Sequence, residues 1–115
     1  CRMELRSPDP ACNPYLAIGL VLAAGLDGIE HRMVLQPPVN KNLFRPGEAE
    51  GLGLEMLPAS LEEAIARAGG SAFVEKVLSA DTARKYLALK QAEQNRWFAA
   101  RDKEKYQDEA YFGVL

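Results

Sequence analysis

The sequence is poor in the residues that build metal centres and disulfide scaffolds. Its 115 residues include two cysteines and one histidine. Cys1 and Cys12 lack the paired C-x-x-C spacing of zinc and redox sites, and two thiols do not make a disulfide framework. We expect Cys12 to be a small buried side chain. His31 has no second histidine to join it as a metal ligand, and it suits the end of a helix, where the dipole favours a cation.

The chain also lacks an excess of charge of one sign and a long apolar run. Its net charge is −2, and the basic residues are scattered among acidic ones. No broad positive surface is therefore available for a phosphate backbone, and we expect no nucleic-acid partner. The longest apolar run, residues 15–26, falls short of the roughly 20 residues that cross a bilayer, and no signal segment precedes it. We expect a cytoplasmic protein without membrane contact.

The first six residues alternate between apolar and charged side chains. In an extended strand over residues 1–6, Arg2, Glu4 and Arg6 share one face, and the apolar set shares the other. Two guanidiniums beside a carboxylate suit a site where a divalent cation meets anionic oxygens, because hard metals prefer carboxylates and Arg binds carboxylate or phosphate. The alternation alone fits equally an exposed strand whose charges neutralise one another.

A capped helix is expected after the turn formed by Ser7-Pro8-Asp9-Pro10. Asn13 suits the N-cap and Pro14 the first helical position, so we place a helix over residues 13–30. The side chains of this helix are apolar on all sides. That pattern predicts a helix buried among other protein in the intact molecule.

The second half of the chain predicts a loop, a helical segment and a tail. Residues 36–58 are rich in Pro, Gly, Asn and charge, which indicates a long surface loop. Residues 60–106 predict a capping box that starts a short helix, a second short helix capped by Ser71, and one long helix from about residue 81 to 106. Alternating charges near the end of that helix indicate a solvated face. The tail, residues 107–115, is apolar and should be covered.

The stretch RMELRSPDPACNPYLA, followed by AGLDGI, closely resembles the region near the C-terminus of the glutamine synthetase family, type I and bacterial-like. The S-L-E-E-A element at residues 60–64 also matches that family. The resemblance implies a mainly α fragment of the α+β glutamine synthetase catalytic domain, with about four helices after one N-terminal strand. It covers about the last quarter of the family's sequence, so we expect residues 1–115 to be the C-terminal portion of that domain, inactive alone.

The resemblance also implies roles for the charged residues of the strand. Glu4 matches a metal ligand, Arg6 a catalytic and substrate-binding arginine that contacts glutamate or the transferring phosphoryl group, and Arg2 an arginine near the nucleotide phosphates. The family joins ammonia to L-glutamate through γ-glutamyl phosphate, with ATP as substrate and Mg²⁺ or Mn²⁺ as cofactor. The implied partners are glutamate, ATP and ammonium, and the remaining ligands come from upstream segments.

Two further features of the family bear on regulation and assembly. The segment Asn40–Phe44 resembles a D-K-N-L-Y loop whose tyrosine is adenylylated in some members, and because Phe44 has no hydroxyl we expect no such control. Type I enzymes are dodecamers of two hexameric rings, with the C-terminal tail inserted into the opposite ring. The resemblance therefore implies a homo-oligomer anchored by Tyr111, Phe112, Val114 and Leu115, although a tail folded onto its own subunit fits the sequence equally well.

Two other functions stay open at this point. A ligase of the same superfamily that joins glutamate to a larger amine, such as a polyamine, would share this segment, since the ammonium site lies outside it. The continuous S-P-D-P-A-C-N-P run favours the true synthetases. A non-catalytic structural homologue would be indicated by loss of Glu4 or Arg6, and both are present.

Overall fold

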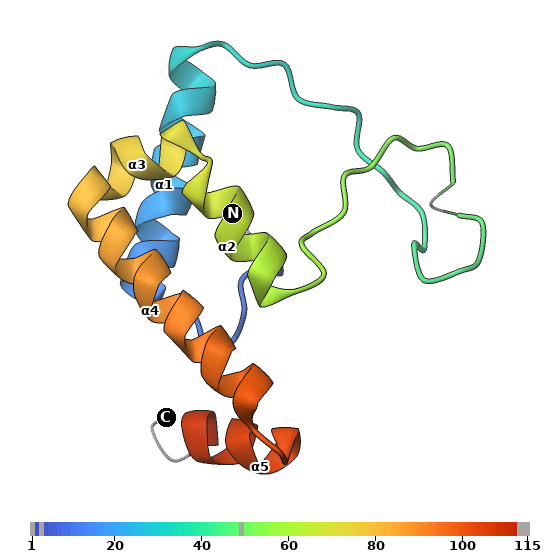
Figure 1. Cartoon of the computed structure of the whole chain (residues 1–115). Helices are drawn as coiled ribbons and strands as arrows, with labels where there is room; N and C mark the ends of the chain where they lie inside the picture. Colours follow the sequence, from blue (N-terminus) through green and yellow to red (C-terminus); the bar gives the residue numbers. More distant parts are fainter. Residues whose placement is uncertain (1, 3, 49, 113–115) are drawn as a thin grey trace.

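The computed structural model describes residues 2, 4–48 and 50–112, and these residues form a mainly helical structure (Figure 1). The elements in chain order are α1 (Pro14–Glu30), α2 (Leu61–Gly69), α3 (Ala72–Leu78), α4 (Ala80–Ala99), α5 (Lys103–Gln107) and the π-helix η1 (Asp108–Phe112). The prediction of a mainly α chain is confirmed, and the helix expected after Asn13 begins and ends as expected.

The strand expected over residues 1–6 is not seen in the part of the chain that the structure describes. Arg2 and residues 4–7 are exposed and have no regular structure, and residues 1 and 3 lie outside the described set. The physical reason is that backbone N–H and C=O groups form a strand only by pairing with a neighbouring strand. The described residues include no strand that could pair with this segment, so side-chain alternation alone is not enough.

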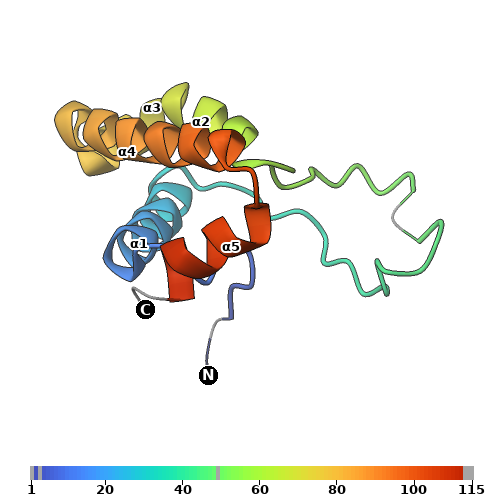
Figure 2. The ribbon, with the colours of Figure 1, turned by 60° about the horizontal axis from the view of Figure 1, so that its bottom comes forward.

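The helices are arranged in two levels, which Figure 2 shows from the side. α2 and α3 pack against α4, and α1 lies beneath them, where it contacts α3. The described part of the segment from residue 31 to 60 contains no helix or strand and extends away from the helices as a long loop, as predicted for residues 36–58. The Cα radius of gyration is 17.0 Å. A compact chain of this length would have a radius of about 13 Å, so this structure is an open one.

Few side chains are buried in this arrangement. Among the described residues, Ala83 and Gln94 are the buried ones, and Gln94 is polar. α1 exposes large apolar side chains along one stripe, at Tyr15, Ile18, Leu22, Leu26 and Ile29. The spacing of three and four residues puts them on one face of the helix. The apolar surround that the sequence predicts for α1 is thus not supplied by the described residues.

The local signals for helix starts are confirmed. The Asn13 side chain accepts hydrogen bonds from the backbone N–H groups of Tyr15 and Leu16, at 3.0 and 3.3 Å. Ser60 Oγ accepts from Glu63 N–H at 3.1 Å, and Glu63 Oε2 accepts from Ala59 N–H at 3.0 Å. The bonds to Asn13 and Ser60 satisfy N–H groups that a helix leaves without intrahelical partners, and the bond from Ala59 ties the residue before the cap to α2. The Ala59 bond, followed by the Arg67 guanidinium, lowers the pKa of the Glu63 carboxyl.

The prediction of a single long helix from about residue 81 to 106 is wrong, because the helix is interrupted between α4 and α5. Ala100 has an extended backbone with ψ 131°, and the Asp102 side chain accepts from Lys105 N–H at 3.0 Å as the N-cap of α5. The Lys103 ammonium donates to the carbonyls of Trp97 and Phe98, the latter at 2.8 Å. It thereby satisfies the Phe98 carbonyl, which the end of α4 leaves free, and adds a second donor to the Trp97 carbonyl, which accepts from Ala100 N–H at 3.3 Å.

The expectation for Cys12 is wrong, whereas the expected position of His31 at the end of a helix is confirmed. Cys12, which we expected to be buried, is partly exposed, since the turn that carries it lies at the surface. His31 follows the last residue of α1, as expected. Its Nδ1 lies 2.9 Å from the carbonyl oxygen of Asp27 and 3.3 Å from the Asp27 carboxylate.

Candidate functional site

The three charged residues at the start of the chain lie together. Arg6 Nε donates to Glu4 Oε1 at 2.6 Å, and an Arg2 guanidinium nitrogen lies 3.9 Å from Glu4 Oε2. One carboxylate therefore stands between two guanidiniums, as the alternating sequence predicts. The arrangement does not need a strand, because an extended backbone of this length suffices to bring side chains two residues apart to the same side.

This cluster is open to solvent and lacks further ligands. The side chains of Arg2, Glu4 and Arg6 are 88, 51 and 86 % exposed. No group of three or more His, Cys, Asp or Glu side chains that could hold a metal ion occurs within residues 2, 4–48 and 50–112. Glu4 offers a carboxylate, the ligand type that Mg²⁺ and Mn²⁺ prefer. The described residues thus fit one ligand of such a site and do not form the site by themselves.

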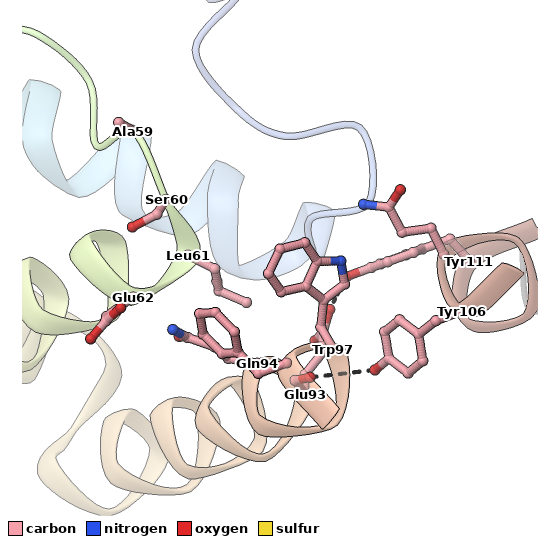
Figure 3. Close-up of a pocket in the computed structure, with 11 residues that line it drawn as sticks. Ala59, Ser60, Leu61, Glu62, Glu93, Gln94, Trp97, Tyr106 and Tyr111 are labelled. Atoms are coloured by element: carbon pink, nitrogen blue, oxygen red, sulfur yellow. Dashed lines mark hydrogen bonds between the residues drawn. The ribbon is translucent and has the colours of Figure 1, made fainter. Parts of the chain in front are cut away.

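A pocket of about 320 Å³ lies where α2, α4 and the C-terminal segment meet (Figure 3). α2 and the residues before it contribute one wall, α4 contributes Glu93, Gln94, Trp97 and Phe98, and the C-terminal segment contributes Tyr106, Gln107 and Tyr111. Sequence reasoning missed this pocket, because it forms only when the break after α4 lets the C-terminal segment turn back. The single Trp of the chain, three residues from a Gln in the same helix, was the available signal.

Glu93 holds the C-terminal segment against α4. Its backbone carbonyl accepts from the Tyr106 hydroxyl at 3.4 Å, and its carboxylate accepts from the Tyr111 hydroxyl. Lys90 Nζ lies 2.8 Å from the same carboxylate. That hydrogen bond raises the pKa of the Lys90 ammonium, while partial burial opposes the shift. The pocket is therefore closed on one side by Tyr106 and Tyr111, whose hydroxyls both hydrogen-bond to Glu93 of α4.

The remaining residues singled out in the sequence lie in the C-terminal tail and in the long loop. Tyr111 folds back onto α4 of its own chain, whereas the Phe112 side chain is 82 % exposed. Val114 and Leu115 lie outside the described residues. The Phe44 side chain is 99 % exposed in the long loop, and its N–H donates to Asn42 Oδ1 at 3.1 Å. The structure does not bring the tail or this loop together with the charged cluster in any hydrogen bond or ion pair among the described residues.

No helix in the described part of the chain is long and apolar enough to cross a membrane.

Comparison with known proteins relates the chain to one family. The sequence profile of the family described as "Glutamine synthetase, catalytic domain" matches residues 1–108. A protein of Methanosarcina mazei named glutamine synthetase is 45 % identical over 100 residues, which are 85 % of this chain and 22 % of the relative. The glutamine synthetase of Methanocaldococcus jannaschii is 43 % identical over 94 residues, or 80 % of this chain and 21 % of the relative.

A bacterial relative is similar over a shorter region. The glutamine synthetase of Staphylococcus epidermidis is 46 % identical over 66 residues, which are 56 % of this chain and 15 % of the relative. The chain thus spans about a fifth or less of the length of these relatives. No solved structure matches the chain.

Proposed function

Since this chain belongs to the glutamine synthetase catalytic-domain family, we propose that the protein of which it forms part joins ammonia to L-glutamate with the use of ATP. The γ-carboxylate of glutamate attacks the γ-phosphorus of ATP and ADP leaves; ammonia then attacks the γ-carbonyl carbon of the acyl phosphate, and phosphate leaves with glutamine as product. The observation that carries the proposal is the Arg2–Glu4–Arg6 cluster, which lies inside the region matched by the family.

Each residue of the cluster has a role in this reaction. Glu4 serves as one carboxylate ligand of a divalent ion, Mg²⁺ or Mn²⁺, whose charge offsets that of the triphosphate when it is bound. The Arg6 guanidinium, now 2.6 Å from Glu4, orients the substrate carboxylate or the transferring phosphoryl group through paired N–H donors. Arg2 faces the nucleotide phosphates as a second positive charge. The other metal ligands and the ammonium site belong to the remainder of the catalytic domain.

The same proposal assigns the exposed apolar elements a place in the complete protein. Residues 1–6 form an active-site strand when a strand from the remainder of the domain pairs with them, and the exposed stripe of α1 is buried against that remainder. The open structure, with two buried residues among those described, supports this reading. We further propose a cytoplasmic homo-oligomer, a dodecamer of two hexameric rings, in which the tail with its exposed Phe112 contributes to contacts between subunits.

The test measures phosphate release by the complete polypeptide with magnesium, ATP and glutamate. Release that depends on ammonium supports the proposed ligase. Release with alkyl amines or polyamines in place of ammonium would instead assign the protein to the branch that ligates larger amines. No release with any amine would favour a non-catalytic homologue.

Substitution of Glu4 tests the assignment of the residue. Glu4→Ala should lower kcat/KM at least about a hundredfold, since even outer-shell partners of metal ligands are worth 10- to 100-fold. Glu48→Ala is the matched control, because Glu48 is a partly exposed carboxylate beside one cation, Lys41, at 3.9 Å. It should leave turnover unchanged. Near-normal turnover of Glu4→Ala in an intact oligomer would refute the role of Glu4.

A further inference from the structure

The chain between α4 and α5 combines a strong local preference for helix with a break in the helix. At the break α5 leaves the direction of α4 (Figure 2). Residues 80–107 nonetheless contain no glycine and no proline, and residues 99–104 are mostly good helix formers. The break therefore has no cause in the backbone itself. When the fold overrides a local preference, specific contacts elsewhere must decide between the two structures.

The ammonium of Lys103 occupies the acceptors that a continuous helix would need. In a helix that ran through the break, the carbonyls of Trp97 and Phe98 would accept from the backbone N–H groups four residues later. Both carbonyls accept from Lys103 Nζ instead, at 2.8 Å for Phe98. The N–H groups of Arg101 and Asp102 make no hydrogen bond among the described residues. Lys103 and the continuation of the helix thus compete for the same two oxygen atoms.

Further contacts favour the folded-back form of the C-terminal segment. Lys103 Nζ lies 4.6 Å from the centre of the Trp97 ring, and the face of an aromatic ring attracts a cation. The Asp102 carboxylate accepts from Lys105 N–H at 3.0 Å, so α5 has a cap of its own. Two tyrosine hydroxyls of the segment hydrogen-bond to Glu93. The single ammonium of Lys103 therefore takes part in three of the contacts that hold the break.

We propose that residues 100–112 form a two-state element controlled by the ammonium of Lys103. While the ammonium caps α4, the segment folds back and its tyrosines close the pocket beside α2. Without the ammonium, α4 continues through the break into α5, the tyrosines leave Glu93, and the pocket loses one wall. The two states are two arrangements of one sequence, each with its own set of hydrogen bonds. The switch uses contacts of residues 93–112 alone, so it does not depend on the proposed ligase activity.

Hydrogen–deuterium exchange of the complete polypeptide, followed by mass spectrometry, distinguishes the two states. In the folded-back form the N–H groups of Arg101, Asp102 and Lys103 have no partner among the described residues and should exchange rapidly. In a continuous helix all three donate to carbonyls of α4 and become protected. Lys103→Met removes the ammonium and keeps a long unbranched side chain that suits a helix. We expect exchange at these three amides to slow about tenfold or more in this variant, relative to an unstructured peptide of the same sequence.

Lys105→Met is the matched control. Lys105 lies two residues later in the same helix, and its ammonium pairs with Glu109 of the C-terminal segment at 3.8 Å. The substitution makes the same change in composition and in helix propensity, so exchange at residues 101–103 should stay rapid. Equal slowing in Lys103→Met and Lys105→Met would mean that propensity decides the break and the Lys103 ammonium does not. That result would overturn the proposal.

Two other outcomes also overturn it. Unchanged rapid exchange at residues 101–103 in Lys103→Met would show that the break persists without the ammonium. Rapid exchange throughout residues 101–112 would show that the segment loses its helical structure, so that no continuous helix competes with the folded-back form. Exchange in α2 and in the first half of α4 reports whether each variant keeps its fold. Lys103→Leu, which is also uncharged and suits a helix, makes the same test if Lys103→Met does not fold.

Discussion

Ser79 joins α3 to α4 in a backbone conformation that L-residues rarely adopt. Its φ is 66° and its ψ is 151°, a region populated almost only by glycine. The hydroxyl nonetheless caps α4, since Ser79 Oγ accepts from Thr82 N–H at 3.4 Å and donates to Thr82 Oγ1 at 3.2 Å. One side chain therefore stabilises a helix start and strains the backbone that presents it, and substitution can separate the two effects.

The expected magnitudes follow from the geometry of Ser79. Backbone strain of this kind costs about 1–3 kcal/mol, and a glycine would relieve it. Replacing a serine cap by glycine loses only a few tenths of a kcal/mol, and the added freedom of the unfolded chain about 0.4–1 kcal/mol. Ser79→Gly should therefore raise the free energy of unfolding by about 1 kcal/mol. Ser79→Ala keeps the strain and loses the cap, so it should lower the free energy of unfolding by about 1 kcal/mol.

Ser71 provides a matched control within the same chain. It caps α3 by accepting from Val74 N–H at 3.3 Å, but its φ of −94° is ordinary. Ser71→Gly should lower the free energy of unfolding by about 1 kcal/mol, so the two glycine variants should differ by about 2 kcal/mol. Urea unfolding followed by circular dichroism at the helix band measures both. Equal destabilisation by Ser79→Gly and Ser71→Gly would refute the assignment of strain to Ser79.

Two more predictions concern titration and modification. The pKa of Glu63 is lowered in the folded chain, so its contribution to α2 is present above the ordinary value of 4.5 and is lost as the pH falls through the lowered pKa. Acidification should therefore reduce helicity less in Glu63→Gln, which keeps the capping box without titrating, than in the unchanged chain. Glu62→Gln serves as the control. The same dependence of helicity on pH in all three chains would contradict the prediction. Phe44 has no hydroxyl, so mass spectrometry should find no AMP on the loop after incubation with an adenylyltransferase and ATP, while Phe44→Tyr tests whether the exposed position is accessible. AMP on the unchanged loop would contradict the expectation.

The elements predicted correctly are those that short-range signals specify. Asn13 followed by Pro14, the capping box at Ser60, and Ser71 before Val74 each satisfy free N–H groups within three residues. Such bonds form irrespective of the remainder of the chain, so the sequence reveals them. The adjacency of Arg2, Glu4 and Arg6 was also predictable, because side chains two residues apart lie on the same side of any extended segment.

The errors arise where distant groups decide the structure. Propensity favours a helix through Arg101, but the ammonium of Lys103 caps the carbonyls of Trp97 and Phe98, and Asp102 starts a new helix. The pocket depends on that break, since only a reversed C-terminal segment brings Tyr111 to Glu93. The strand at residues 1–6 requires a partner strand, and no pattern within a segment can supply one. Secondary structure that depends on pairing is therefore harder to infer than secondary structure that caps itself.

The described residues cover the apolar side chains of α2 better than those of α1. α2 packs against α4 with Ala64, Ile65 and Ala68 partly buried, and its Arg67 pairs with Glu63 at 3.0 Å, so its sequence and the described structure agree. α1 carries Ile18, Leu22 and Leu26 on a face that the described residues leave exposed at about 60 %. A helix apolar on all sides is stable when protein surrounds it. The charged cluster lies shortly before α1 in the chain, since only residues 7–13 separate Arg6 from Pro14. The role proposed for Glu4 therefore requires further polypeptide beside the cluster, and the apolar face of α1 requires it only a few residues later in the chain.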